Sequence, residues 1–391
     1  MPRKDIILNL PGFAIRKISG NNPIFIEVEC RRGIKCIHCN GKRLRKKSKL
    51  IRKVRHESIG LRHTYLMIKG HKYYCYGCNK YFNQRFPGIG KYQRATQNLK
   101  RQVFHHHTQG TSQKDLARDL KIGKATIERW YHERYVHEYK RINTPSLPRA
   151  LGIDEHFFSK KQGYATTFCD LTKNKIFDIV KGRSSKDLEK YLKNLANKER
   201  VKVICIDLSN TYRAIIRKYF PKAKIVADRF HVIRLINHRC MQTYHHIDEN
   251  IRYQRGLLAA LKTNPENLTL KNLQKRDEYL ADNPSIKHIY HFKQKLHRLL
   301  MKRHCTAKNC ERLIPFYIRM VEQLKEIGFP HLAKLGRTLH EWRDEIVRMW
   351  RFTKNNGITE GFHRKMKLIQ RRAYGFRNFE NYRLRVKVLC G

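Results

Sequence analysis

Residues 201–207, VKVICID, form an apolar run that ends on an acid. The run lacks the alternation of polar and apolar residues that marks a strand with one exposed face, so it predicts a strand buried on both faces. The residues that follow, SNTYRAIIRKYFP, predict a helix that begins at Ser209 or Asn210 and stops at Pro221. KIVADRFH then predicts another strand. This order indicates an α/β sheet with parallel crossovers.

The preceding segment predicts the rest of this sheet. ALGIDEHFF predicts a short strand that ends on Asp154, and GYATTFCDL and NKIFDIV predict two further strands. SSKDLEKYLKNLANK predicts an amphipathic helix with Leu188, Leu192 and Leu195 on one face. The complete order is three strands, helix, strand, helix, strand.

Asp154 and Asp207 are each predicted to lie at the carboxyl end of a strand, and these ends form the working edge of an α/β sheet. A single Asp in such a place is most often a helix cap or a solvated loop residue. Two carboxylates held close together repel each other, and both stay ionised only if a cation lies between them. Mg²⁺, or Mn²⁺ in its place, is the expected cation because it prefers hard oxygen ligands and phosphate.

A third acid is expected far downstream, in NNGITEGFHRKMKLIQRRAYGFRNFENYRLRVK. This segment predicts a helix whose core-facing stripe consists of Ile358, Phe362, Met366 and Ile369. Glu360 lies off that stripe and is predicted to share a face with four basic residues: His363, Arg364, Lys367 and Arg371. Such a face suits a metal ligand with DNA held alongside. The alternative is a surface ion pair between Glu360 and Arg364.

The charge of the chain indicates its partner. The 391 residues, of which 40% are hydrophobic, include 85 Lys and Arg against 32 Asp and Glu, a formal net charge of +53 spread along the whole chain. Such a chain attracts polyanions, and DNA first of all, because each neutralised phosphate releases counterions. No apolar run approaches the ~20 residues of a spanning helix, and the amino terminus lacks the pattern of a signal peptide. We expect a soluble, cytoplasmic protein.

Two Cys-x-x-Cys pairs, CIHC and CYGC, predict a metal site near the amino terminus. Cys36, Cys39, Cys75 and Cys78 can complete a closed four-sulfur zinc site, with short ribbon strands between the pairs. The alternative is a set of four reduced cysteines in a small core. Three nearby residues could also enter the ligand set: Cys30, His38 and His71.

Residues 111–135, TSQKDLARDLKIGKATIERWYHERY, predict two helices joined by a short break. Ser112 can cap the first helix. The core-facing residues are expected to be Leu116, Ala117, Leu120, Ile127 and Trp130. Lys124, Thr126 and Arg129 then point outward from the second helix, which is typical of a helix-turn-helix that enters the major groove of DNA. The preceding HHH at 105–107 is interpreted as a solvated helix face.

Several of these stretches together resemble the DDE transposases of bacterial insertion sequences, specifically the ISL-three family. They are CIHC…YYCYGC, the helix-turn-helix, GIDE, IDLSNTY, VADRFHVIR and GITEGFHRKMKLIQRRAYGFRNFENYRLRV. The resemblance implies an RNase H-like fold in which Asp154, Asp207 and Glu360 form the metal-binding triad. It also implies a supporting Asp-x-x-His element, Asp228 and His231, which by residue type alone could equally be a helix cap and a packed imidazole. His363 departs from the family pattern, in which Asn is expected after Glu-Gly.

The predicted organisation has five parts. They are a zinc ribbon at 1–90, a helix-turn-helix and linker at 91–145, the first part of the RNase H-like core at 146–231, an all-helical insertion at 232–350, and the last part of the core at 351–391. Within the insertion, Cys305 and Cys310 are interpreted as thiols rather than a second zinc site. Trp342 and Trp350 belong either to its core or to a surface that stacks on an unpaired base.

The expected function is that of a transposase that binds its terminal inverted repeats, cleaves DNA with two metal ions and transfers the strand. Joining two DNA ends implies a homo-oligomer, at least a dimer on DNA. One alternative is a DNA-binding regulator or catalytically inactive transposase relic. Another is an RNase H-like nuclease for junctions or RNA hybrids, against which the DNA-reading amino terminus argues.

Overall fold

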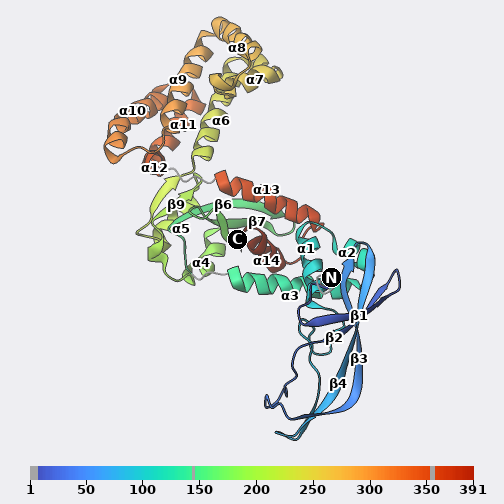
Figure 1. Ribbon diagram of the computed structural model, residues 1–391. Coiled ribbons are helices and arrows are strands. Elements are labelled where there is room, and N and C mark those ends of the chain that lie inside the picture. The colour runs from blue at the N-terminus through green and yellow to red at the C-terminus, as the bar shows by residue number, and fades with distance from the viewer. Residues whose placement is uncertain (1–7, 143–145, 353–356) are drawn as a thin grey trace. The chain divides into compact units, whose positions relative to one another are not determined.

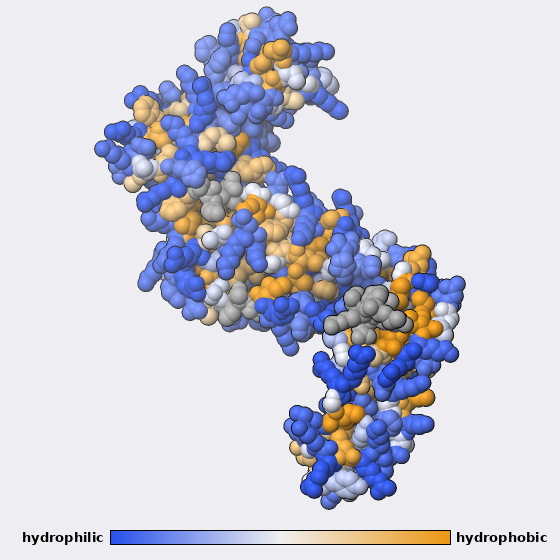
Figure 2. Space-filling model, viewed as in Figure 1, coloured by the Kyte–Doolittle hydropathy of each residue, from blue (hydrophilic) through white to orange (hydrophobic). Residues whose placement is uncertain are grey.

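The computed structural model describes residues 8–142, 146–352 and 357–391 (Figure 1). The chain divides into two compact units, Met1–Arg141 with Arg371–Gly375, and Ile142–Gln370 with Phe376–Gly391. Residues 143–145 of the predicted linker lie outside the described part of the chain. Within the described ranges, no helix combines the length and apolar character that a membrane span needs. Hydrophilic residues cover most of the face shown in Figure 2, and hydrophobic residues gather there in smaller patches.

The first unit contains a five-stranded sheet in the order β1-β2-β4-β3, with β5 paired to β4. Its strands are β1 (Phe13–Ser19), β2 (Ile24–Cys30), β3 (Leu44–Ile59), β4 (Arg62–Cys75) and β5 (Lys80–Asn83). The expectation of short strands between the cysteine pairs is wrong, because β3 has 16 residues and β4 has 14. In β4, alternate residues such as Leu66 and Ile68 are buried, whereas most of β3 before Val54 is exposed. The β3–β4 ladder runs from the pair Leu44 and Cys75 to the pair Ile59 and Arg62, so the hairpin extends well beyond the cysteines.

Three helices follow the sheet, α1 (Gln97–Thr108), α2 (Gln113–Leu120) and α3 (Lys124–Ile142). Ser112 caps α2 as predicted, since its hydroxyl accepts a hydrogen bond of 3.1 Å from the backbone N–H of Asp115. The buried residues of α2 and α3 include Leu116, Leu120, Ile127 and Trp130. The helix-turn-helix prediction is therefore confirmed, with α1 as an additional helix.

The histidine run lies at the end of α1. His105 and His106 are exposed, as the interpretation of a solvated face requires. His107 differs, because its ring stacks on that of Tyr131 at 4.0 Å and its Nδ1 lies 3.3 Å from the hydroxyl of Tyr135. The third histidine thus helps to pack α1 against α3.

The second unit is built on a five-stranded sheet in the order β10-β9-β6-β7-β8. Its strands are β6 (Ala150–Ser159), β7 (Gly163–Asp170), β8 (Lys175–Lys181), β9 (Val203–Ile206) and β10 (Lys224–Ala227). Two connecting helices, α4 (Ser185–Lys193) and α5 (Asn210–Tyr219), complete the predicted order. β6, β9 and β10 run parallel, whereas β7 and β8 pair antiparallel, so the core has the RNase H-like arrangement.

β6 is longer than the sequence predicts. The expectation that this strand ends on Asp154 is wrong, because the strand continues to Ser159. Its second half pairs with β7, with His156 opposite Ala165 and Phe157 opposite Tyr164. Asp154 therefore lies inside a strand, at the point where β6 leaves its pairing with β9 and retains that with β7.

Helices cover both faces of this sheet. Ile153, Ile204 and Ile206 belong to a core shared with α4, α5 and the helical insertion. Cys205, the neighbour of two of them, points to the opposite face and packs with α13 (Gly357–Arg372) and α14 (Phe379–Cys390). Burial on both faces explains why VKVICID lacks alternation.

Residues 232–350, all of which the structure describes, contain helices and short helical turns but no strand, as predicted. The helices of this region are α6 (Arg229–Ile247), α7 (Arg255–Lys262), α8 (Leu270–Asp282), α9 (Pro284–Met301), α10 (Ala307–Glu326), α11 (Pro330–Glu341) and α12 (Arg343–Arg351). Both tryptophans lie in its core, with Trp342 1% and Trp350 0% exposed, so the interpretation that they stack on a base is wrong. Cys310 is buried and Cys305 half-buried.

A buried ion pair joins α5 of the sheet to α12 of the insertion. Glu345 is 1% exposed and accepts hydrogen bonds of 2.9 and 3.0 Å from Nε and Nη2 of Arg213. The guanidinium of Arg213 also lies 4.5 Å from the ring centroid of Trp342. Arg217 approaches the same carboxylate at 3.5 Å, but its side chain is 62% exposed.

Replacing Arg213 by Met should destabilise the second unit by about 3 kcal/mol, because Glu345 would keep its buried charge without its main partner. Urea unfolding followed by tryptophan fluorescence measures this loss. Arg217→Met is the matched control and should change stability by less than about 1 kcal/mol, since its side chain is solvated. Equal effects of the two variants would contradict the role of Arg213.

Candidate functional site

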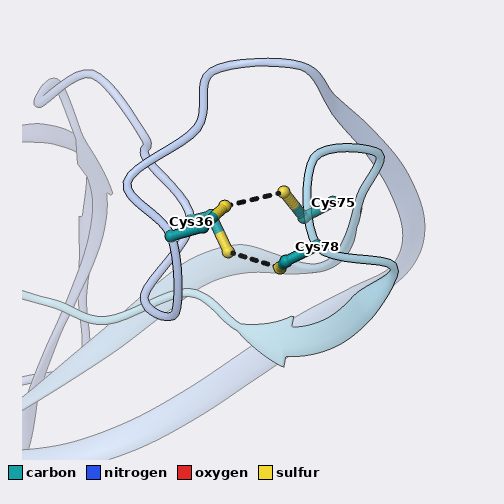
Figure 3. A group of neighbouring side chains, drawn as sticks. Cys36, Cys75 and Cys78 are labelled. Atoms are coloured by element: carbon teal, nitrogen blue, oxygen red, sulfur yellow. Dashed lines mark hydrogen bonds between the residues drawn. The ribbon is translucent and has the colours of Figure 1, made fainter.

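The four cysteines of the two predicted pairs come together in the first unit (Figure 3). Cys36 and Cys39 precede β3, Cys75 ends β4, and Cys78 lies in the turn to β5. The pairing of Leu44 with Cys75 in the β3–β4 ladder brings these loops together. All four sulfurs lie within 4.8 Å of one another. This is the predicted ligand set.

The geometry of the cluster fits a zinc ion. The Sγ atoms of Cys36 and Cys78 lie 3.6 Å apart, and those of Cys39 and Cys75 lie 3.5 Å apart. A tetrahedral site with Zn–S bonds of about 2.3 Å would place its sulfurs about 3.8 Å apart. Burial acts to raise the pKa of the Cys36 thiol, but hydrogen bonds from the backbone of Cys39 and His38 lower it to about 6, which favours the thiolate that zinc requires.

The other candidate ligands lie outside this cluster, namely Cys30, His38 and His71. His38 contributes a backbone N–H, 3.4 Å from the Sγ of Cys36, rather than its ring. Gly41 lies close beside the site, since a Cβ there would lie 3.2 Å from the Sγ of Cys39. The four sulfurs thus form a closed structural zinc site.

In the second unit, strand register places three acids side by side. The last pair between β6 and β9 is Gly152 with Cys205, and Asp154 and Asp207 each follow two residues later. β9 and β10 end on the pair Ile206 and Ala227, after which Asp207 and Asp228 follow directly. Three neighbouring parallel strands therefore carry carboxylates at the same level of the sheet.

These carboxylates are largely withdrawn from water. The side chain of Asp154 is 13% exposed, and burial raises its pKa to about 6. Burial likewise raises the pKa of Asp207 to about 6, and Asp228 adds repulsion to both. His231 opposes these shifts at both acids, because its positive charge favours the carboxylates. Ionisation of one of these acids therefore disfavours ionisation of its neighbours.

The donor set at this edge fits a divalent cation. Oδ1 of Asp207 is buried and has no hydrogen-bond partner within the described part of the chain. A buried carboxylate oxygen without a donor is costly, and a hard cation bound there would satisfy it. Asp154 and Asp207 are thus the residues that could hold Mg²⁺.

Asp228 and His231 lie next to this pair. Asp228 is 1% exposed and caps α6, accepting a hydrogen bond of 3.4 Å from the backbone N–H of Phe230. Nε2 of His231 lies 3.6 Å from Oδ2 of Asp228, and its side chain is 26% exposed. The Asp is thus a helix cap in geometry, whereas the imidazole is partly open to solvent rather than packed in a core.

Glu360 is not brought to the aspartates in this conformation. It lies in the first turn of α13, and its Oε1 accepts a hydrogen bond of 2.7 Å from Nη2 of Arg364, with both side chains largely exposed. Among the described residues, Asp154, Asp207 and Glu360 do not form a group with ligand atoms all within 4.8 Å of one another. The surface ion pair that the sequence offered as the alternative is therefore present.

His363 connects the same helix to the acids. Its Nδ1 lies 3.8 Å from Oδ2 of Asp154, and its Nε2 lies 3.2 Å from the Oγ1 of Thr167. The expectation that His363 shares an outer face with Glu360 is wrong, since its side chain is 12% exposed. The step of three residues from Glu360 to His363 turns about 300° around the helix axis, which is about 60° short of a full turn. The imidazole of His363 therefore lies at the margin of the buried face of α13.

The residues predicted to contact DNA lie at the surface. Lys124 and Arg129 on α3 are exposed and Thr126 is half-buried. Three more cations are exposed on α13, in the turns that follow Glu360: Arg364, Lys367 and Arg371.

Sequence reasoning missed a pocket of about 540 Å³ beside α3. Thr126 and Arg129 line it together with Arg55, Tyr92 and Lys121. Tyr92 is 82% exposed in a left-handed backbone conformation with φ of +59°. An aromatic residue flanked by glycines and cations, as in GIGKYQR, was the available signal.

Comparisons with known proteins match three consecutive parts of the chain. Residues 32–78 match the zinc-finger of transposase IS204/IS1001/IS1096/IS1165, and residues 84–135 match the helix-turn-helix domain of transposase family ISL3. Residues 151–386 match the DDE model of the same family, which is described as transposase. A transposase for insertion sequence element IS1001 from Bordetella parapertussis is 24% identical over 363 residues, which cover 90% of this chain and 87% of that protein.

Replacing Cys75 by Ser should reduce bound zinc well below one ion per chain and lower the melting temperature of the first unit, because one of four ligands is lost. Zinc content by atomic emission and thermal unfolding by circular dichroism measure the two effects. Cys30→Ser is the matched control, since Cys30 lies outside the cluster. Full zinc occupancy in the Cys75 variant would contradict the assigned ligand set.

Proposed function

Because the chain belongs to the ISL3 family of transposases, we propose that it binds the terminal inverted repeats of its own insertion sequence and catalyses metal-dependent cleavage and strand transfer. The observation that carries this proposal is the alignment of Asp154, Asp207 and Asp228 at one edge of the sheet, with a buried oxygen of Asp207 unpaired within the described residues. No ordinary structural role requires this arrangement in a chain of charge +53.

Asp154 and Asp207 would hold the metal, and Asp228 and His231 would support them from the first turn of α6. When bound, two Mg²⁺ ions, or Mn²⁺, would activate water and stabilise the leaving oxygen at the scissile phosphate. His231 would hold Asp228 in place through the 3.6 Å contact of its Nε2 with Oδ2, and burial keeps bulk water away from the carboxylates. These residues orient the phosphodiester for the first cut and for attack by the freed 3′-hydroxyl.

Glu360 would complete the metal site through a change of partner. Its carboxylate now binds Arg364, while His363 from the same turn already lies beside Asp154. Residues three positions apart on a helix lie about 5–6 Å from each other, so the first turn of α13 is close to the acidic edge. Release from Arg364 would turn Glu360 toward the metal, and the freed guanidinium would bind DNA phosphate.

The DNA duplex would be read by α3 and held by exposed cations. We assign Lys124, Thr126 and Arg129 to the major groove. Arg364, Lys367 and Arg371 would contact phosphates near the cleavage site. Joining two ends would require at least a dimer of the chain on DNA, in the nucleoid of a bacterial cell.

The proposed domains correspond to five segments of the chain. Residues 1–90 would form the zinc ribbon, 91–145 the helix-turn-helix with its linker, and 232–350 the insertion. Residues 146–231 and 351–391 would together form the catalytic core. The matches at 32–78 and 84–135 support a separate zinc ribbon and helix-turn-helix, whereas the match at 151–386 covers the proposed core and insertion together.

Asp154→Asn, Asp207→Asn and Glu360→Gln should each reduce cleavage of end-labelled terminal-repeat DNA by more than about 100-fold, because each removes a metal ligand. All three variants should still bind DNA, since none loses a DNA-contacting side chain and Glu360→Gln frees Arg364 for a phosphate. Cleavage is measured on gels with Mg²⁺, and binding by fluorescence anisotropy.

Glu326→Gln, an exposed acid at the end of α10, is the matched control and should cleave at the normal rate. Normal cleavage by all three site variants would contradict the catalytic proposal. Normal cleavage by Glu360→Gln alone would exclude this acid from the site. Binding by the native chain without any cleavage would favour the alternative of a regulator or inactive relic.

Arg129→Ala should weaken binding of the terminal repeat by about 1–3 kcal/mol and reduce the preference for this repeat over a duplex of unrelated sequence, because it removes a base contact in the major groove. Affinities for the two duplexes, measured by anisotropy at one salt concentration, give both values. Lys140→Ala, on the same helix about 16 Å beyond Arg129, is the matched control. Unchanged affinity of the Arg129 variant would exclude α3 as the recognition helix.

A further inference from the structure

Helix α6 links the acidic edge of the sheet to the helical insertion. It begins directly after β10, with Asp228 as its cap, and has 19 residues, or about 28 Å of helix. Its first turn carries His231, whose Nε2 lies 3.6 Å from Oδ2 of Asp228. Figure 1 shows α6 leaving the sheet and continuing into the insertion. A molecule bound along α6 would therefore start beside the proposed catalytic residues.

A groove of about 680 Å³ follows one side of this helix. It runs from Phe230 and His231 in the first turn to Met241 in the fourth, and Lys262 at the end of α7 forms part of its wall. The distance from residue 230 to residue 241 along a helix axis is about 16 Å. That length corresponds to about five nucleotides stacked at 3.4 Å each.

The charge of the groove suits a nucleic acid backbone. Arg234, His238 and Lys262 line it and are exposed. None of the described residues that line it is acidic. Arg234 and His238 lie three and seven residues after His231, so the basic groups lie along one side of the helix. The phosphates of a strand that extends from the acidic edge along α6 would contact these groups one after another.

An exposed aromatic ring lies at the catalytic end of the groove. Phe230 is 50% exposed, so its ring is accessible from the groove. Its ring centroid lies 5.5 Å from that of His231. A phenyl ring in this position offers a surface on which an unpaired base can stack, a contact worth about 1–3 kcal/mol per base.

The size of the groove favours one strand over a duplex. Its volume lies within the range of about 300–1,000 Å³ that is typical of sites for single small ligands. A DNA duplex presents its bases only at groove edges, whereas an unpaired strand exposes both bases and phosphates. Phe230 and the cations of the groove match those two features.

We propose that this groove binds a single-stranded DNA segment that adjoins the scissile phosphate, with Phe230 stacking on its first unpaired base and Arg234 and Lys262 contacting its phosphates. The inference rests on the proposed transposase reaction, and it gives the helical insertion a function: α6 and α7 hold the separated strand as it leaves the catalytic residues.

The test compares two DNA ligands, a blunt terminal-repeat duplex and the same duplex with a single-stranded extension of five nucleotides. Binding of each to the full-length chain is measured by fluorescence anisotropy without added Mg²⁺. The native chain should bind the extended ligand about fivefold more tightly or better, since one stacked base contributes at least ~1 kcal/mol. Phe230→Ala, and the double variant Arg234→Ala with Lys262→Ala, should lose this gain and keep the affinity for the blunt duplex.

Two matched controls lie on α10, away from the groove lining. Phe316→Ala removes a comparably exposed ring (60%), and Arg319→Ala removes an exposed cation. Both variants should retain the tighter binding of the extended ligand. Phe230→Tyr should retain it as well, because a tyrosine ring also stacks on a base. Thermal unfolding by circular dichroism checks that every variant is folded.

Equal affinity of the native chain for both ligands, or a full gain in Phe230→Ala, would overturn the inference. A gain lost equally in the α10 controls would overturn it as well. These results would leave the proposed function intact, because they concern only the extension. Absence of binding to the blunt terminal repeat would instead contradict the proposed function itself.

Discussion

The parallel register of β6, β9 and β10 holds three aspartates together against their mutual repulsion. Asp154, Asp207 and Asp228 follow equivalent positions on neighbouring strands, so the backbone pairing places their Cα atoms next to one another at one edge of the sheet. Burial on both faces of β9 then withdraws them from water and raises the pKa of Asp154 and Asp207. Packing in the sheet supplies the free energy that opposes this repulsion, and a metal ion would relieve it.

The helices around this edge add to the same effect. α5 begins after Ser209 and α6 after Asp228, so two helix amino termini lie beside the acids and favour negative charge. The insertion is attached by the Arg213–Glu345 ion pair and by the continuity of α6 with β10. A rigid helix from the acidic edge into the insertion makes that region an extension of the site rather than a separate module.

The candidate site was predictable to different degrees. Asp207 could be located because an apolar run buried on both faces has few other interpretations, and the acid stands at its end. The cysteine pairs were equally clear, since their spacing leaves zinc as the main interpretation. The end of β6 was missed, because its continuation depends on pairing with β7, which local residue patterns do not report. His363 was placed on the wrong face for a similar reason, since a residue about 60° from Glu360 can lie on either side of the boundary of a helix face.

What the amino-acid order determined by itself was local: the elements and their order, the zinc ligands, the caps at Ser112 and Ser209, and the basic charge that selects DNA. These depend on neighbours within a few residues or on composition. The tertiary structure decided between alternatives that the sequence left open: Glu360 binds Arg364, and the tryptophans are core. It also placed Asp228, which the family resemblance implied, beside Asp154 and Asp207, and it alone showed that a groove follows α6. Each of these depends on which distant side chains fill the same space, and that depends on the packing of the whole unit rather than on the pattern of any single segment.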